Sequence, residues 1–151
     1  MTLVFPSVEW MRALAELANE DDEFKKIGRL DAVVAFKVGP DVYSVTFDVL
    51  DCRDVRAIGE AEMREADFVV EMQPERWEAM LTDIRAHGHA SRDFTLNTLD
   101  LSEDDPIHRN VAGDGYRADK FFRYNPSLQR FFDNAARLDT VFERSRPAST
   151  A

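Results

Sequence analysis

The sequence predicts an α+β fold, with a single twisted and mostly antiparallel sheet of about five strands covered on one face by helices. Three observations lead to this prediction: apolar residues at helical spacing near both ends of the chain, strand-like alternation through its middle, and a strand that becomes a helix at a proline. Successive strands followed by helices are typical of α+β domains. At 151 residues the chain has the length of one domain. We expect this domain to span residues 1–144, followed by a flexible polar tail at 145–151.

Two helices are predicted in the N-terminal part. Ser7 is a suitable N-cap for the first, because its hydroxyl can accept a backbone hydrogen bond from the first turn. Apolar residues then recur on one face as far as Asn19, and Trp10 widens that face. A second, short helix is predicted at residues 21–27.

Three strands are predicted next. Residues 30–38 and 42–50 are rich in β-branched and aromatic side chains, and the second segment alternates strictly between polar and apolar. A short turn at Gly39 separates them, so we expect an antiparallel hairpin. A third strand is predicted at 53–58. Residues 59–64 are compatible with a turn, a bulge or a helical turn.

Residues 66–84 form the most informative stretch. Alternation at 67–72 predicts a half-buried strand. Pro74 cannot donate to a ladder, but its fixed φ suits the first turn of a helix. Glu75 then complements the positive end of the helix dipole. The predicted helix has one apolar face, made of Trp77, Met80, Leu81 and Ile84.

After this helix the sequence predicts a loop at 87–90, a late strand at 94–101 and a loop-rich segment at 102–115. The acidic residues of the last segment lack the alternating ligand register of a calcium loop, so no calcium site is expected.

A last helix is predicted near the C-terminus. Asn125 is expected to cap it and Pro126 to occupy its first position. The apolar pattern extends toward Phe142. Its main apolar side chains are Leu128, Phe131 and Phe132.

The charge of the chain excludes several classes of partner. The formal net charge is −10 and the pI is near 4.7. Nucleic acids need a basic face, and anionic membranes attract basic segments, so neither nucleic acid binding nor stable membrane insertion is expected. The N-terminus lacks a basic segment followed by an apolar run, so no signal peptide is predicted and a cytoplasmic location is expected.

Metal binding is not predicted. Cys52 is the only cysteine, which excludes an intramolecular disulfide and a thiolate zinc site; we expect a buried, unreactive thiol. His87 and His89 are two residues apart, which does not place them on one helical face, and His108 is distant in sequence.

Asp48 is the most notable acidic residue, because it lies within a strongly apolar strand. Its alternation with Phe47 and Val49 favours an outward-facing side chain. If it instead faced a cavity, burial would raise the pKa of its carboxyl group and make it a candidate acid–base group.

Several features together carry a family resemblance. They are an N-terminal helix with Trp10, the hairpin at 33–50, a strand that begins Ala-Asp-Phe-Val-Val, and the helix Glu-Arg-Trp-Glu-Ala-Met-Leu at 75–81. A late strand at 95–101 and an apolar terminal helix complete the order. Over residues 8–138 the chain thus resembles the sterol carrier protein type two domain family, with the strand-to-helix stretch as its most specific part.

The resemblance implies a hydrophobic tunnel between the sheet and the helices. The tunnel would hold a lipid, such as a fatty acyl chain, a sterol or an acyl-CoA, without catalysis and without a cofactor. Two features depart from the family: the polar segment 102–120 is longer, and the chain does not end in a Ser-Lys-Leu peroxisomal signal. The residues expected to bind the ligand are Phe36, Phe47, Phe68, Val70, Trp77, Met80, Leu81, Ile84, Phe131 and Phe132.

Two other functions are compatible with the sequence. A small cone-shaped α+β enzyme, such as an isomerase, cyclase or dehydratase, would use Asp48, His87, His89 or His108 as its acid–base group on a hydrophobic substrate. A homodimer or an accessory subunit of a larger enzyme would instead present an exposed apolar patch.

Overall fold

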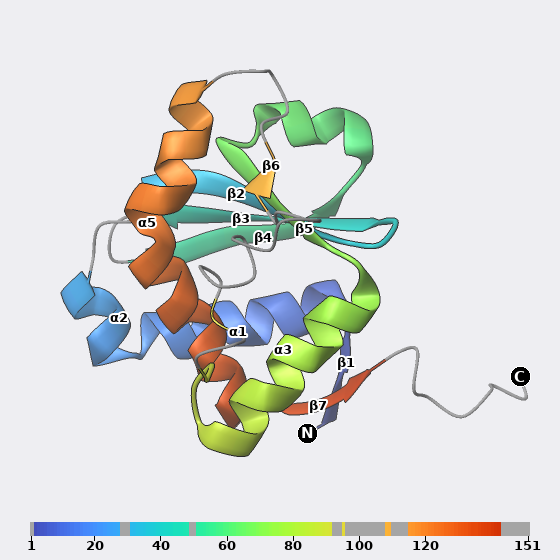
Figure 1. Cartoon of the computed structure of the whole chain (residues 1–151), viewed down its shortest axis with the longest axis vertical. Helices are drawn as coiled ribbons and strands as arrows, with labels where there is room; N and C mark the ends of the chain where they lie inside the picture. The colour runs from blue at the N-terminus through green and yellow to red at the C-terminus, as the bar shows by residue number, and fades with distance from the viewer. Residues whose placement is uncertain are drawn as a thin grey trace, which may run out of the picture.

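Within the described residues, the main sheet of the protein contains five strands. A computed structural model describes residues 2–27, 31–48, 51–91, 95, 108–109 and 115–142 (Figure 1). In chain order the strands are β2 (Asp31–Val38), β3 (Asp41–Asp48), β4 (Asp51–Ile58), β5 (Phe68–Met72) and β6 (His108–Arg109). They lie in the order β4-β3-β2-β5-β6, and all neighbours are antiparallel except β2 and β5, which are parallel. The predicted α+β fold with a mostly antiparallel sheet of about five strands is confirmed.

Four helices accompany this sheet in the described residues: α1 (Val8–Asn19), α2 (Asp22–Ile27), α3 (Pro74–His87) and α5 (Gly115–Asp133) (Figure 1). The helix starts predicted at Ser7 and Pro74 are confirmed. The Ser7 hydroxyl accepts a hydrogen bond from the Trp10 amide at 3.0 Å, and Pro74 occupies the first turn of α3. Gly88 ends α3 in the left-handed conformation, which a glycine adopts without steric cost.

The parallel pairing of β5 with β2 is fixed by Asp67, the residue before β5. Its amide donates to the Val33 carbonyl, and its carboxylate accepts from the Val33 amide, each at 2.7 Å. One aspartate thus satisfies both backbone groups of a neighbouring strand residue. This explains physically why the strand begins with Ala-Asp: Ala66 is small enough to be buried and Asp67 joins the two strands.

The hairpin between β2 and β3 turns at Gly39, which has a φ of +57°. A Cβ placed on Gly39 would lie 3.0 Å from Cγ of Pro74, whereas a Cβ on Gly88, with a φ of +83°, would meet no atom within 4 Å. The turn is therefore packed against the start of α3, and the end of α3 is open.

We predict that Gly39→Ala destabilises the protein more than Gly88→Ala. Both substitutions place an L side chain in the left-handed region, at a cost of about 1–2 kcal/mol. Only Gly39→Ala adds a steric conflict with Pro74. Urea unfolding of the two variants measures the difference; equal losses would contradict a close packing of the turn on α3.

β4 is irregular and is held from outside the sheet. A bulge interrupts its pairing with β3 between Ser44 and Thr46, and Asp54 has a φ of +52° there. The side chain of Asn19 makes two hydrogen bonds to the backbone of Cys52. Its Nδ2 donates to the Cys52 carbonyl at 3.0 Å, and its Oδ1 accepts from the Cys52 backbone N–H at 2.7 Å. The end of α1 thereby pairs with the outer edge of β4. The chain then forms a 3-10 helix, η1 (Glu60–Glu65), which is the helical turn among the predicted alternatives.

A second, two-stranded sheet was not predicted. β1 (Thr2–Phe5) pairs in parallel with β7 (Asp139–Phe142). The extension of the last helix toward Phe142 is therefore wrong: α5 ends at Asp133, and a 3-10 turn, η3 (Asn134–Arg137), leads into β7. The local apolar spacing is helical, but pairing with a distant segment decides the conformation of β7.

The predicted start of the last helix is also wrong. α5 begins at Gly115, so Pro126 lies inside it and Asn125 is not its cap. Leu128, Phe131 and Phe132 are fully buried on this helix. We attribute its continuity through Pro126 to this tertiary burial, which outweighs the loss of one backbone donor.

Two further predictions concern the segment after α3. Within the predicted loop-rich segment 102–115, residues 108–109 form strand β6. The predicted late strand at 94–101 lies outside the described residues, apart from Thr95. The proposed tail at 145–151 also lies outside them.

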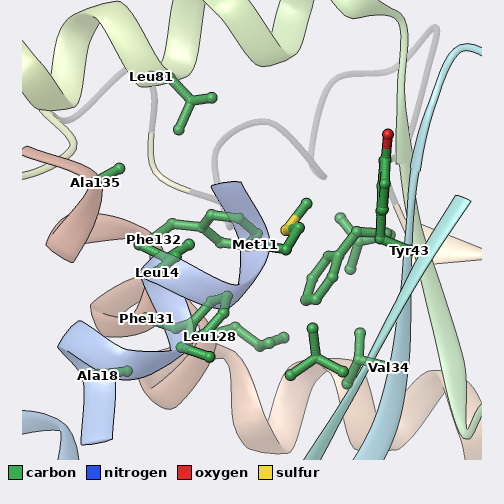
Figure 2. Packing of buried hydrophobic residues seen from close by; sticks show 14 of the residues in the cluster. Met11, Leu14, Ala18, Val34, Tyr43, Leu81, Leu128, Phe131, Phe132 and Ala135 are labelled. Atoms are coloured by element: carbon green, nitrogen blue, oxygen red, sulfur yellow. The ribbon is translucent and has the colours of Figure 1, made fainter. Parts of the chain in front are cut away.

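The large hydrophobic core lies between the main sheet and the helices (Figure 2). Alternate residues of the strands, such as Val34 and Phe36, face it. The opposite face of the sheet has a small cluster made of Ala35, Val42, Ala66 and Val69. The sheet therefore has one strongly apolar face and one that is only partly covered.

Candidate functional site

The ten residues predicted to bind a ligand all lie in the large core. Each is at most 3% exposed. Those of β2, β3 and β5 face the helices, and those of α3 and α5 face the sheet. Phe131 and Phe132, both labelled in Figure 2, join the two layers. The sequence thus identifies side chains that are far apart in the chain and adjacent in the fold.

Five aromatic side chains among these ten contact one another in a continuous layer, called the aromatic layer below. They are Phe36, Phe47, Trp77, Phe131 and Phe132. The rings of Phe36 and Phe132 are 5.1 Å apart in an edge-to-face arrangement, and those of Phe47 and Phe131 are 5.0 Å apart. Trp77 lies 5.4 Å from Phe132. Such contacts stabilise aromatic pairs by about 0.5–1.5 kcal/mol beyond the burial of their area.

Trp77 connects this layer to the sheet by a polar contact. Its indole Nε1 donates to the Lys37 carbonyl at 2.9 Å, while the ring is fully buried. Because this carbonyl belongs to β2, the hydrogen bond fixes α3 over the centre of the sheet. A tryptophan at this position therefore has a positioning role that helical spacing alone does not reveal.

Among the cavities lined by described residues are three of 270 to 800 Å³. The largest, of 800 Å³, lies along β4. A second, of 270 Å³, is lined by apolar residues such as Phe5, Val38 and Phe142. A third, of 410 Å³, lies between α3 and β7 and is lined by Leu81 and Phe142 among others. Of the ten predicted residues only Leu81 lines one of these three cavities, and the other nine pack against one another and the rest of the core.

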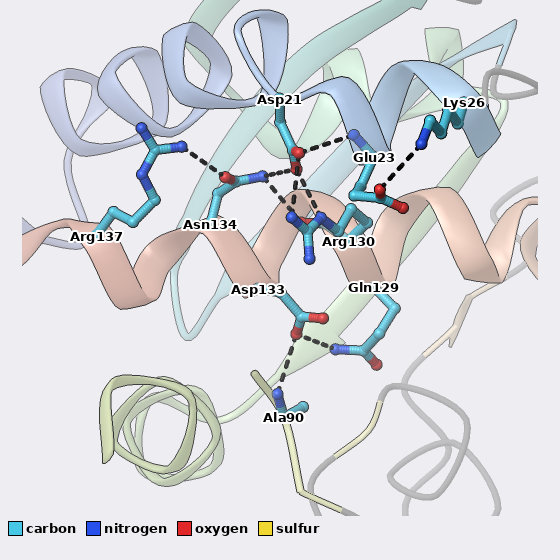
Figure 3. A network of polar contacts seen from close by, with 9 residues as sticks. All are labelled: Asp21, Glu23, Lys26, Ala90, Gln129, Arg130, Asp133, Asn134 and Arg137. Carbon is cyan, nitrogen blue, oxygen red and sulfur yellow. Dashed lines mark hydrogen bonds and ion pairs between the residues drawn. The ribbon is translucent and has the colours of Figure 1, made fainter. Parts of the chain in front are cut away.

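A buried polar network joins α2 to α5 (Figure 3). The Asp21 carboxylate is 7% exposed and accepts hydrogen bonds from Arg130 Nε at 2.6 Å and from Asn134 Nδ2 at 2.9 Å. Burial alone would raise the pKa of Asp21, but these hydrogen bonds and the charge of Arg130 lower it to about 2. The sequence signal that was missed is an acidic residue immediately before a short helix, where it also accepts from the Glu23 amide.

Two further aspartates hold the chain that leaves α3. Asp83 accepts from the amide and hydroxyl of Ser91 at 2.6 and 2.7 Å. Burial opposes ionisation of Asp83, but the Ser91 hydrogen bonds and His87 lower its pKa. Asp133 accepts from the Ala90 amide at 3.0 Å (Figure 3), and its burial raises its pKa. Both carboxylates thus accept hydrogen bonds from the backbone of residues 90–91 and hold this part of the chain in place.

The acid–base residues of the enzyme hypothesis do not converge in the described structure. Asp48 is half exposed at the end of β3 and pairs with Arg53 at 3.0 Å. His87 is exposed and contacts Asp83, while His89 is exposed and contacts the Ala90 carbonyl. The side chain of His108 lies outside the described part of the chain. These placements give no support to an acid–base site within the core.

Cys52 is buried, as predicted. Burial, followed by the charge of Asp51, raises the pKa of its thiol to about 12. The thiol is therefore protonated at neutral pH and a poor nucleophile. Among the residues with described side chains, no three histidine, cysteine or acidic groups are arranged to hold a metal ion.

Comparisons with known proteins support the fold. No protein-family model and no curated protein matches the chain. A similar solved structure is the solution structure of a conserved hypothetical protein from Thermus thermophilus, described with reservation as a sterol carrier protein. It has a TM-score of 0.58 and 19% identity, over 85% of this chain and 87% of that chain. No described helix of this protein has the length and hydropathy needed to cross a membrane. The chain thus has a fold similar to that of a suggested sterol carrier protein.

Proposed function

We propose that this protein binds a lipid or another hydrophobic molecule, such as a fatty acyl chain or a sterol, between the sheet and helices α3 and α5, without catalysis. The observation that carries the proposal is the fold likeness to a suggested sterol carrier protein, combined with an aromatic layer between the sheet and the helices. The ten predicted residues would form the ligand contacts.

A ligand would enter by separating side chains that now contact one another. Met80 and Met11 are suited to this, because unbranched thioether side chains repack at low cost. Each methylene group transferred from water into the layer would contribute about 0.8 kcal/mol. A chain of many methylene groups can therefore offset the loss of contacts between the aromatic side chains.

The two tryptophans allow the position of the ligand to be tested. Trp10 and Trp77 are the only tryptophans of the chain, and both are fully buried. Trp77 lies in the aromatic layer, whereas Trp10 packs edge-to-face on Phe5 at 4.7 Å and donates to Thr140. Each can be made the sole reporter, by Trp10→Phe or by Trp77→Phe.

We predict that dibromostearate, whose bromine atoms quench indole fluorescence on contact, quenches the Trp10→Phe variant saturably. At saturation the quenching should be larger than in the Trp77→Phe variant, so that a difference in affinity does not enter the comparison. Unbrominated stearate should bind without this quenching and compete with the brominated ligand. Native mass spectrometry of the same samples reports the ligand stoichiometry and any dimer. Absence of saturable quenching in both variants would refute lipid binding, and quenching of Trp10 alone would place the ligand elsewhere.

A further inference from the structure

The 800 Å³ cavity along β4 is separate from the proposed lipid site. It is lined by residues of α1, β2, β3, β4 and η1, and by none of the ten residues predicted to bind a ligand. α1 runs beside β4 (Figure 1), where Asn19 holds the strand edge. The volume is within the range of cavities that bind small molecules.

Ser44 is a buried polar group that opens into this cavity. It lies on the face of the sheet turned away from the large core and is only 4% exposed. Its hydroxyl forms no hydrogen bond within the part of the chain that the structure describes, although it is not sealed off in the interior. A buried hydroxyl that lacks a protein partner gains a hydrogen bond when a polar ligand group reaches it.

The strand register places a positive charge next to this hydroxyl. Arg56 lies directly opposite Ser44, on the same face of the sheet. Its guanidinium group forms no ion pair within the described residues and lines the cavity. A hydroxyl and a guanidinium group side by side are suited to a ligand carboxylate, which accepts from both.

The other residues that line the cavity provide carboxylates that can contact a cationic group and apolar side chains that can contact a hydrocarbon chain. Glu62 and Glu65 of η1 line the cavity, and the left-handed Asp54 forms the bulge of β4 opposite Val45. Carboxylates outnumber guanidinium groups around the cavity, in a chain with a net charge of −10. Val33 and Ile58 provide apolar surface on the same face of the sheet as Ser44. The charged residues that line it are Arg12, Glu16, Asp54, Arg56, Glu62 and Glu65.

We propose that this cavity binds a small zwitterion of the amino-acid class with an apolar side chain. The ligand carboxylate accepts hydrogen bonds from Ser44 and Arg56, and its ammonium group faces the carboxylates of the lining. Its hydrocarbon part covers Val33 and Ile58. A zwitterion can pair with the guanidinium group and with the carboxylates of the lining at the same time. A simple anion or a simple amine can pair with only one of the two.

A matched series of probes tests this proposal: leucine, 4-methylpentanoate, which lacks the amine, and 3-methylbutylamine, which lacks the carboxylate. In a titration followed by amide chemical shifts, leucine should bind more tightly than either partial analogue and should shift residues 54–58. Absence of saturable shifts with leucine, or equal affinity for the three probes, would overturn the proposal.

Variants of residues on the two paired strands test the assignment of the ligand contacts, and one further variant serves as the control. Ser44→Ala and Arg56→Gln should each weaken leucine binding on the order of tenfold, as expected for a lost hydrogen bond to a charged group. Arg53→Gln should leave it unchanged, because Arg53 is exposed on β4 but does not line the cavity. A loss with Arg53→Gln equal to that with Arg56→Gln would indicate a general charge effect and contradict the assignment. Stearate binding is measured in parallel, so that failure of one site is distinguished from failure of the other.

Discussion

Trp77→Ala is expected to destabilise the protein by about 3–5 kcal/mol, the typical cost of removing a tryptophan from a core. Trp77 is fully buried, contacts Phe36 and Phe132, and donates to the Lys37 carbonyl. The substitution therefore leaves a cavity at the interface of α3 with the sheet and removes a hydrogen bond between them. Denaturant unfolding gives the change in free energy, and an unchanged midpoint would contradict the structural role of this residue.

Trp77→Phe separates packing from hydrogen bonding. It keeps most of the apolar volume but removes the Nε1 donor, which should cost about 1–3 kcal/mol. Trp10→Phe is the matched control, because Trp10 is equally buried and also donates a hydrogen bond, to Thr140 at 3.0 Å. If the lipid proposal holds, Trp77→Phe changes stearate affinity and Trp10→Phe does not.

Asp21→Asn is expected to cost about 2–3 kcal/mol, less than the loss of a fully buried ion pair because Arg130 is 37% exposed. The amide removes the charge that Arg130 faces and one set of acceptor lone pairs. Arg130→Gln should destabilise to a similar extent, and the double variant should lose less than the sum of the two. Full additivity would contradict the coupling between α2 and α5.

The same carboxylate predicts a pH dependence. The pKa of Asp21 is about 2 in the folded protein, below its ordinary value of 3.8. A lowered pKa stabilises the folded state at pH values above the unfolded-state pKa, and this contribution is lost as the pH falls from about 4 to about 2. The wild-type protein should thus lose about 2 kcal/mol more than Asp21→Asn over this interval. The free energy of unfolding of both proteins is measured between pH 4 and pH 2. An equal loss of this free energy in the two proteins would contradict the prediction.

The elements that the sequence predicts correctly carry local signals. Ser7 caps α1, Pro74 begins α3, and Gly39 marks a two-residue turn; each acts through backbone chemistry within a few residues. The aromatic core follows similarly from apolar spacing. Residues chosen because they share a helical or strand face, such as Phe47 and Phe131, do meet in the structure.

The features that the sequence did not predict depend on distant partners. β7 has a helical pattern but pairs with β1, and Pro126 lies within a helix because burial holds both sides of it. The cavity along β4 was missed for the same reason. Nothing local in the sequence distinguishes Ser44 or Arg56 from other polar strand residues. Only the register of the neighbouring strands β3 and β4 places them side by side.

The pairing of β1 with β7 has a consequence for folding during synthesis. Thr2 pairs with Asp139, so the first strand finds its partner only after residues 139–142 have left the ribosome. Until then residues 2–5 expose unpaired backbone groups, and α1 lacks the Thr140 acceptor of Trp10. Such a contact between distant segments slows folding, because a very long loop must close before it forms. The pairing of β1 with β7 should therefore be a late step in the folding of this domain.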